Sequence, residues 1–438
     1  MAGRAPTSEH ARRAATQIVH ALREHGHVAT FAGGCVRDEL LGLAPSDYDV
    51  ATDATPDRVR RIFPHSDLVG ACFGVVLVKL RIEGDHVVVE VATFRADGPY
   101  SDSRRPDAVT FSTQIEDAKR RDFTVNALYL DPNGSTSMIA GREIRGRVID
   151  MVGGIPDIES RTLRAVGDAD TRLAEDHLRA LRAVRLAAKL GFTIEPATAD
   201  AIRRNASHLR GVSRERIGDE IRRMLAHPTR SRAAEFLRDL GLERPVLDAA
   251  GAGATGLKPD RFGPGLVLSR LEPEAPPMLA LGAWAIDLGI PLLQAPVDAF
   301  IRGCRAALCL SNDERQELHS TLHGLRQLSD PAFWIGLTVA RRKRFAAGPQ
   351  FPGGMALLRA IDRPRASSIA SDVDALALTF GGLAPDPLVT GDDLVEAGWP
   401  PGPAFKRVLD AVYDAQLEGA IVSQAQGMEL ARGLGVYK

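Results

Sequence analysis

The stretch FAGGCVRDELLGLAPSDYDVAT, residues 31–52, predicts a strand, a short helix and a second strand in immediate succession. The chain turns into the helix at Gly33 and Gly34, and this helix carries Arg37 in its first turn and ends at Gly42. Glycines let backbone amides approach an anion, a helix start favours negative charge, and an arginine adds a bidentate donor. The stretch has neither the GxGxxG dinucleotide fingerprint nor the GK[ST] of a phosphate-binding loop. We therefore expect a site suited to a triphosphate, with an ordinary turn as the alternative.

Three carboxylates form a second candidate feature. Asp47 and Asp49 lie two residues apart in the predicted strand DYDVAT, so both should face one side of it and Tyr48 the other. Two carboxylates this close repel unless a cation lies between them, and hard oxygen ligands beside a phosphate suit Mg²⁺. Two metal ions would need a third carboxylate, for which Glu90 in VVVEVATFR is the candidate. The alternatives are a solvated strand end for the aspartates and an exposed edge strand for Glu90.

Composition excludes several classes of protein. The 438 residues, 45% hydrophobic and 25% charged, are ordinary for a soluble globular protein of several domains. No apolar stretch reaches the roughly 18 residues of a membrane span, so we expect no membrane partner. The cysteines include no CxxC pair and predict thiols in a reducing compartment, the cytoplasm; they are Cys35, Cys72, Cys304 and Cys309.

Charge is informative only locally. The net charge of −1 by itself gives no sign of a nucleic-acid partner. Between Arg172 and Arg232, however, basic residues clearly outnumber acidic ones. Such an excess indicates a polyanion partner, although a solvated helical face would show the same pattern.

The periodicity changes along the chain. The first 150 residues alternate strands and helices, including a hairpin over GVVLVKLRI and HVVVEVATF, whereas strand signals almost vanish after about residue 155. Two strong helices are predicted, AEDHLRALRAVRLAAKLGF closed by Gly191 and SRERIGDEIRRMLAH capped by Ser213. Further predictions are a loop at 97–117, a helix over RRDFTVNALYL, a hinge at 250–277, and helix breaks near 348–354 and 383–402.

Six segments occur in one order with plausible spacing: GGCVRDELLG…SDYDVAT, EVATFR, YSDSRRPD, RRDFTVNAL, AEDHLRALRAVR and SRERIGDE. Together they resemble the class II tRNA nucleotidyltransferase and bacterial poly(A) polymerase family, within the polymerase-β-like nucleotidyltransferases. The resemblance covers roughly residues 28–225. It implies an α+β fold, with a nucleotidyltransferase head built on a small mixed β-sheet at 1–154, a helical neck at 155–249 and a helical body and tail at 250–438.

The resemblance also implies roles for individual residues. It assigns Asp47 and Asp49 to the metal pair and Glu90 to the third active-site carboxylate. The positions that it assigns to the nucleotide are Gly34 and Arg37 for the triphosphate, Arg121, Asp122 and Asn126 for the nucleotide and its ribose, and Asp176, Arg179, Arg182 and Arg185 on a nucleotide-binding helix. Gly33 joins them from the glycine pair. One departure is His177, where many relatives have proline.

An acceptor and a donor could select the base. Asp176 and Arg179 are three apart in a predicted helix and so would be neighbours on one face. Cytosine and adenine both offer an exocyclic amine beside a ring-nitrogen acceptor, which an Asp–Arg pair matches. Guanine and uracil invert that pattern and would leave buried groups unpaired. Arg182 and Arg185 rotate progressively off this face. An ordinary salt bridge between Asp176 and Arg179 is the alternative.

The expected activity is template-independent addition of CMP and AMP to the tRNA 3′ end from CTP and ATP, with two Mg²⁺ ions. The helical remainder would bind the tRNA acceptor arm; no oligomeric state is predicted. Poly(A) synthesis and addition of A alone remain alternatives within the family. The loop ADGPYSDSRRPDAVTFS disfavours addition of CC alone, and LVGACFGVVLV lacks the basic stretch typical of bacterial poly(A) polymerases. A catalytically dead RNA-binding protein is the alternative from another class.

Overall fold

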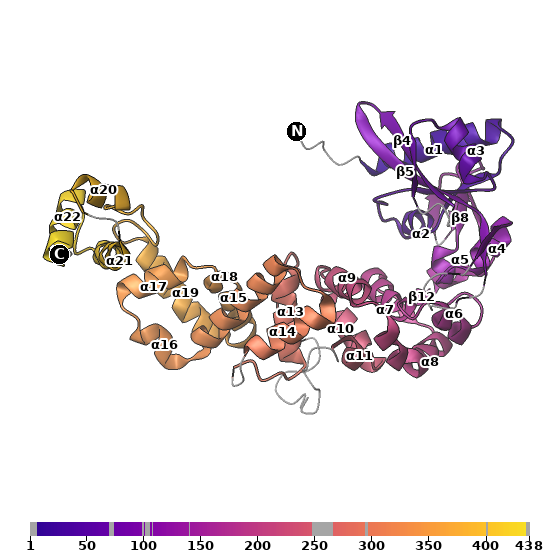
Figure 1. Cartoon of the computed structure of the whole chain (residues 1–438). Helices are drawn as coiled ribbons and strands as arrows, with labels where there is room; N and C mark the ends of the chain where they lie inside the picture. The colour runs from indigo at the N-terminus through magenta and orange to yellow at the C-terminus, as the bar shows by residue number, and fades with distance from the viewer. Residues whose placement is uncertain are drawn as a thin grey trace. The chain divides into compact units, whose positions relative to one another are not determined.

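The computed structural model describes residues 7–69, 74–98, 100, 106, 108–139, 141–247, 266–293, 297–399 and 402–434. The chain divides into two compact units. The first comprises Met1–Glu220 with Phe236–Val246, and the second comprises Ile221–Glu235 with Leu247–Lys438. Figure 1 shows the sheet in the N-terminal part and helices in the rest. This is the α+β architecture that the sequence predicts.

A seven-stranded mixed sheet organises the head, in the order β11-β8-β1-β2-β5-β4-β3. Strands β2 and β5 pair in parallel, and the other neighbours pair antiparallel. Helix α1 (Ser8–Glu24) buries its apolar side, including Ile18 and Leu22, and contacts β1, β2, β4 and β5. The strands are β1 (Ala29–Ala32), β2 (Asp49–Thr52), β3 (Ser66–Val69), β4 (Val75–Ile82), β5 (Asp85–Thr93), β8 (Tyr129–Asp131) and β11 (Arg147–Ile149).

The local signals around the first two strands are confirmed. Helix α2 (Gly34–Leu41) follows β1 directly and ends at Gly42, whose left-handed backbone (φ 70°) satisfies the last carbonyls. Helix α3 (Pro56–Ile62) begins after Thr55, and β4 and β5 form the predicted hairpin. One boundary differs, because β2 begins at Asp49 and leaves Asp47 just before the strand.

Two predictions between residues 97 and 130 are wrong. The expected loop at 97–117 contains β7 (Val109–Phe111), which pairs with β6 (Arg95–Asp97), and helix α4 (Gln114–Lys119). The rest of that loop, residues 99, 101–105 and 107, lies outside the described residues. The segment RRDFTVNALYL forms a single 3₁₀ turn, η2 (Thr124–Asn126), and then β8. Pairing of β8 with β1 and β11 overrides the helical pattern.

The segment 174–192 is two helices, not one. Helix α6 (Ala169–Glu175) ends where Asp176 adopts an extended backbone (φ −153°), and α7 (Arg179–Leu190) follows. The Asp176 carboxylate accepts a hydrogen bond from the Leu178 amide at 3.1 Å and so satisfies one of the orphan donors at the start of α7. Gly191 closes α7 as predicted.

The predicted break at 348–354 is only partly present. A turn at residues 347–349 is followed by helix α18 (Gln350–Ile361), which runs through Gly353 and Gly354. These glycines let α18 approach α15 (Asn312–Ser329), since a Cβ on Gly354 would lie 2.6 Å from the Gly324 carbonyl carbon. The predicted hinge at 250–277 lies largely outside the described residues, as does Cys72.

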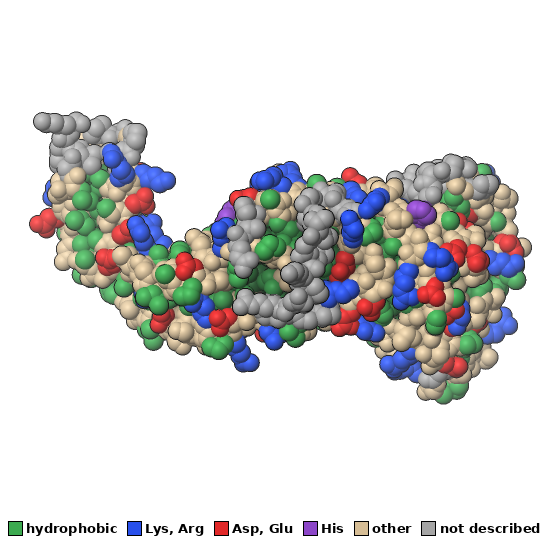
Figure 2. All heavy atoms as spheres, turned by 90° about the horizontal axis from the view of Figure 1, so that it is seen from below, with side chains coloured by type: hydrophobic (Ala, Val, Ile, Leu, Met, Phe, Trp, Pro, Cys, Tyr) green, Lys and Arg blue, Asp and Glu red, His purple; other side chains and the backbone are tan. Residues whose placement is uncertain are grey.

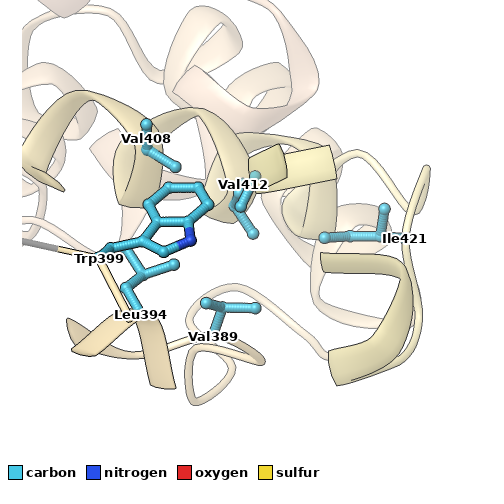
Figure 3. Close-up of a cluster of buried hydrophobic side chains, with 7 residues drawn as sticks. Val389, Leu394, Trp399, Val408, Val412 and Ile421 are labelled. Atoms are coloured by element: carbon cyan, nitrogen blue, oxygen red, sulfur yellow. The ribbon is translucent and has the colours of Figure 1, made fainter. Parts of the chain in front are cut away.

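Helices account for most of the other described elements, which also include four short strands, paired as β9 with β10 and β12 with β13, and the 3₁₀ turn η3. Helix α19 (Arg363–Ala377) contacts α17 and α18, and a separate core lies near the C-terminus. Figure 3 shows Trp399 in this core, with Leu394, Val408 and Val412 around its ring. The other elements are β9 (Ser137–Ile139), β10 (Arg142–Ile144), α5 (Gly154–Glu159), β12 (Thr162–Leu163), β13 (Thr193–Ile194), α8 (Pro196–Asn205), η3 (Ala206–Gly211), α9 (Arg214–Leu225), α10 (Arg230–Asp239), α11 (Glu243–Leu247), α12 (Leu266–Ser269), α13 (Pro277–Asp287), α14 (Val297–Leu308), α16 (Pro331–Gly336), α17 (Val339–Ala346), α20 (Gly391–Glu396), α21 (Pro403–Leu417) and α22 (Gln424–Gly433).

Candidate active site

A cavity of about 530 Å³ lies within the first unit, and most of the predicted site residues line it. Basic side chains outnumber acidic ones in its wall, which suits an anionic ligand. Asp49 lines the cavity, whereas Asp47 and Glu90 do not. Both of these carboxylates interact electrostatically with Asp49. The lining residues are Gly33, Gly34, Arg37, Asp49, Arg120, Arg121, Asp122, Asn126, Asp176, Leu178, Arg179, Arg182, Arg185, Leu186, Lys189 and Arg216.

The sheet brings the three predicted carboxylates together. Val50 of β2 pairs with Val91 of β5 in parallel register, so Asp49 and Glu90 are level and on the same face. Strand β5 lies between β2 and β4, which excludes the edge-strand interpretation of Glu90. Burial, with the added effect of the Glu90 and Asp47 charges, raises the pKa of Asp49 to about 7 against the opposing Arg121.

This acid cluster has excess negative charge and an open geometry. Asp49 is largely buried, whereas Asp47 and Glu90 are exposed to solvent. The carboxylate oxygens of the three residues do not all lie within 4.8 Å of one another. The donors are hard oxygen atoms, and a pKa near 7 for Asp49 shows that its charge is poorly compensated by the protein. The residues therefore fit divalent cations in composition and charge.

The glycine turn is shaped by a nearby arginine. Gly33 has φ +80°, and a Cβ there would lie 2.9 Å from an Arg121 Nη atom, so glycine is required by both backbone and space. The buried Arg37 side chain is held by Asp38, at 2.6 Å from Nη2, and by the amide oxygen of Asn126. The first-turn amides of α2 have no acceptor within their own helix. This end of the cavity thus presents fixed donors.

Ion pairs of Asp117 and Asp122 fix the wall formed by the RRDF segment. Asp117 accepts hydrogen bonds from Arg120, Arg121 and Tyr129, which places Arg121 against the glycine turn. Asp122 receives two hydrogen bonds from Arg182, at 2.7 and 3.0 Å. Burial alone would raise the pKa of Asp122, but the Arg182 guanidinium outweighs it and lowers the pKa to about 2. Asp122 is therefore ionised at neutral pH.

Asp176 and Arg179 both line the cavity but do not form the predicted i,i+3 pair. Because Asp176 precedes α7, its carboxylate pairs with Arg216 at 2.6 Å, while Arg179 pairs with Glu175 at 2.5 Å. The ordinary salt bridge between Asp176 and Arg179 is thus excluded. The expected single helical face is also wrong, since the two groups reach the cavity from a helix junction.

Much of the local basic excess is compensated by ion pairs. Arg185 pairs with Glu220, and the pairs of Arg179, Arg182 and Arg216 are given above. On the face seen in Figure 2, Lys and Arg side chains are interspersed with Asp and Glu. The count of basic residues between Arg172 and Arg232 is therefore weak support for a polyanion partner.

Sequence reasoning missed several residues that hold the site. Asp117 and Glu175 lie three or four residues from the arginines they bind, so helical spacing could have identified both. Arg216 lies 40 residues from Asp176, and no local pattern indicates that pair. Lys189 also lines the cavity and was not singled out.

These features define a class of protein. Carboxylates on two parallel neighbouring strands, a glycine turn at a helix start and a cavity rich in arginine are the parts of a polymerase-β-like nucleotidyltransferase head. The model of the poly A polymerase head domain matches residues 29–164, and that of the probable RNA and SrmB-binding site of polymerase A matches residues 191–250.

Comparison with characterised proteins identifies the family. The chain is 34% identical over 422 residues to the CCA-adding enzyme of Geobacillus thermodenitrificans, which covers 93% of each protein. It superposes on the Bacillus stearothermophilus CCA-adding enzyme solved with CTP with a TM-score of 0.72 and 31% identity, over 96% of this chain and 98% of that one. A Thermotoga maritima CCA-adding enzyme complexed with tRNA, 16% identical with a TM-score of 0.66 over 97% and 95% of the two chains, shares the fold. The chain belongs to the class II tRNA nucleotidyltransferase and bacterial poly(A) polymerase family, as the six motifs predict.

No helix in the described part of the chain is both long and apolar enough to cross a membrane.

Proposed function

We propose that the chain adds CMP and AMP to the 3′ end of tRNA without a template, using CTP and ATP, and so builds the terminal CCA. The observation that carries this proposal is the arginine-rich cavity, which combines the carboxylate Asp49, the glycine turn and the Asp176 and Arg179 side chains. The likeness to CCA-adding enzymes over nearly the whole chain supports it.

The acid cluster would hold the metal ions. Asp47 and Asp49 are the proposed Mg²⁺ ligands, with Glu90 as the third active-site carboxylate. Bound Mg²⁺ supplies Lewis-acid stabilisation of the charge that develops at the reacting phosphate and lowers the pKa of the attacking RNA hydroxyl. The positions of Asp49 and of Glu90 beside it would determine where the cations bind.

The other side chains bind and orient the nucleotide. The first-turn amides at Gly34 and the fixed Arg37 guanidinium would hold the β and γ phosphates. Asn126 contacts both Arg37 and Asp122, so the triphosphate and ribose ends of the site are linked. Arg121, held by Asp117, would contact the nucleotide between them.

Base selection is assigned to the helix junction. The Asp176 carboxylate would accept a hydrogen bond from the exocyclic amine of cytosine or adenine. The Arg179 guanidinium would donate a hydrogen bond to the ring nitrogen beside that amine. Arg216 and Glu175 hold these two groups at 2.6 and 2.5 Å. Guanine and uracil would instead place a carbonyl against Asp176 and a ring N–H against Arg179, and a site built on hydrogen bonds can reject such misfits by factors on the order of 10⁴.

The helical remainder is proposed to bind RNA. We assign the chain to a head at 1–154, a neck at 155–249 and a body and tail at 250–438. The body and tail would bind the tRNA acceptor arm through contacts to the RNA backbone. We propose that the protein acts in the cytoplasm. The model of a probable RNA-binding site that matches residues 191–250 supports RNA binding by the proposed neck.

Product analysis tests the proposal. Purified protein is incubated with tRNA lacking CCA, Mg²⁺ and CTP, ATP or both, and products are read at nucleotide resolution. Terminal CCA is expected, with CC from CTP alone. A long A tail would indicate a poly(A) polymerase, extension by A alone an A-adding enzyme, and binding without extension a catalytically dead RNA-binding protein. Each of those three results contradicts the proposal.

A variant pair tests the metal assignment. Asp49→Ala should abolish incorporation while leaving tRNA affinity largely intact, because it removes a metal ligand and no proposed RNA contact. The matched control is Asp67→Ala, which removes an exposed carboxylate on β3 that pairs with Lys79. Incorporation by Asp49→Ala at the rate of Asp67→Ala would refute the assignment.

A further inference from the structure

A cluster of three potential ligands lies in the second unit, well separated in sequence from the head. Asp298 is in the first turn of α14, and His319 and His323 are one turn apart on α15. Their ligand atoms all lie within 4.8 Å of one another, and among the described residues no other group of three His, Cys, Asp or Glu does so. The two imidazole rings lie 4.1 Å apart between centroids.

The geometry of this cluster suits a metal better than a hydrogen-bonded triad. The two histidine Nε2 atoms lie 3.6 and 3.5 Å from the same Asp298 oxygen, Oδ1. Good N–H···O hydrogen bonds span about 2.7–3.2 Å, so both contacts are too long. Bonds of about 2.0–2.1 Å to a tetrahedral ion place neighbouring ligand atoms roughly 3.3–3.5 Å apart, close to the spacing seen.

The surroundings leave the cluster accessible to an ion from solvent. The side chains are between about one third and one half exposed, so an ion can enter from solvent.

We propose that Asp298, His319 and His323 form a binding site for a divalent transition-metal ion of the zinc class. Two imidazole nitrogens and one carboxylate oxygen are a three-ligand set that leaves the fourth tetrahedral position to water. Nitrogen donors favour zinc, nickel or copper over magnesium, which prefers oxygen. The bound ion would join α14 to α15 and is independent of the Mg²⁺ ligands in the head.

Metal titration of the whole chain tests this site. Chelator-stripped protein is kept in excess Mg²⁺, which fills oxygen-ligand sites, and Zn²⁺ is added in a calorimeter. The wild type should bind one Zn²⁺ ion that Mg²⁺ does not displace. His319→Ala and His323→Ala should each weaken binding by more than about tenfold, because changes outside the ligand shell alone cost 10–100-fold. The control His65→Ala removes an exposed histidine elsewhere and should bind as the wild type does.

A second readout separates a lost ligand from a lost fold. All three tryptophans, Trp284, Trp334 and Trp399, lie in the second unit, so their fluorescence reports its thermal unfolding. Zn²⁺ should raise the wild-type melting temperature but not that of His323→Ala, which should melt normally without metal. Co²⁺ should give the visible absorption of four-coordination in the wild type alone. Absence of a Zn²⁺ site in the wild type, or equal binding by His323→Ala, overturns the proposal.

Discussion

At the scale of single residues, the site depends on charges that the fold holds in place. Asp49 and Asp122 are both buried carboxylates, yet their pKa values move in opposite directions, to about 7 and about 2. The difference comes from their partners, because Asp49 faces Glu90 and Asp47, whereas Asp122 faces Arg182. Asp122 therefore stays ionised and paired with Arg182, whereas ionised Asp49 would be stabilised by a bound cation.

The raised pKa of Asp49 predicts a pH dependence. The folded-state pKa of about 7 lies above the ordinary 3.8, so the metal-free protein loses stability as pH rises between these values. Asp49 must be ionised to act as the proposed metal ligand, so nucleotide incorporation should fall as pH drops below about 7. Higher Mg²⁺ should move the midpoint to lower pH, because the cation competes with the proton. Rates measured from pH 5.5 to 9 at two Mg²⁺ concentrations check this; a midpoint unaffected by Mg²⁺ would contradict it.

We expect Glu175 to position Arg179 for the proposed base selection. Its carboxylate holds Arg179 at 2.5 Å and Arg172 at 2.7 Å. Glu175→Gln should weaken this hold and lower the preference for CTP over UTP by about tenfold or more, since small misplacements of a reacting group cost such factors. Steady-state kcat/KM with each nucleotide measures the preference. An unchanged ratio together with a lower melting temperature would show a purely structural role.

At the scale of elements, junctions position the side chains more than regular helices or strands do. Arg37 follows a strand-to-helix turn, Asp49 begins β2, and Asp176 separates α6 from α7. Outside the head, the crossing of α15 and α18 depends on glycines that bring the two backbones together. Such close contacts leave no space for a methyl group.

Replacing one of these glycines should destabilise the second unit. In Gly354→Ala the new Cβ would lie 2.6 Å from the Gly324 carbonyl carbon, so α15 and α18 would have to separate. We expect a loss of about 1–3 kcal/mol in the free energy of unfolding, typical of overpacking. Chemical denaturation followed by tryptophan fluorescence measures it. Gly336→Ala, with no atom within 4 Å of its Cβ, is the control and should change stability far less.

At the scale of the whole molecule, the proposed nucleotide site and the tryptophans belong to different units. Every residue that lines the cavity lies in the first unit, and all three tryptophans lie in the second. A ligand that binds only the folded form of one unit stabilises that unit, by about 2.7 kcal/mol at 100 times its Kd. The two units can therefore be followed separately.

Calorimetry and fluorescence should respond differently to CTP. Saturating CTP should raise the melting temperature of a calorimetric transition that tryptophan fluorescence does not report, while the fluorescence transition stays in place. Arg37→Ala should remove the shift, because Arg37 is a proposed phosphate ligand. An equal shift of both transitions would show that the units unfold as one and would contradict this prediction.

Much of the head was predictable because its signals are local. The glycine pair, the Gly42 cap, the β4–β5 hairpin and the end of α7 at Gly191 follow from backbone preferences within a few residues. The RRDFTVNALYL segment was not predictable in this way, because its last residues form β8 through pairing with β1. The break at Asp176 was hidden because helix-forming residues surround it on both sides.

The sequence by itself determined the class of chemistry, since three carboxylates, a glycine turn and paired arginine motifs specify ligands for cations and phosphates whatever their exact placement. Only the tertiary structure decided which partners these groups have. It placed Glu90 level with Asp49 in an interior strand, separated Asp176 from Arg179, and gave them Arg216 and Glu175 instead. The physical reason is that pairing across a sheet or between helices depends on contacts distant in sequence, which local periodicity does not encode.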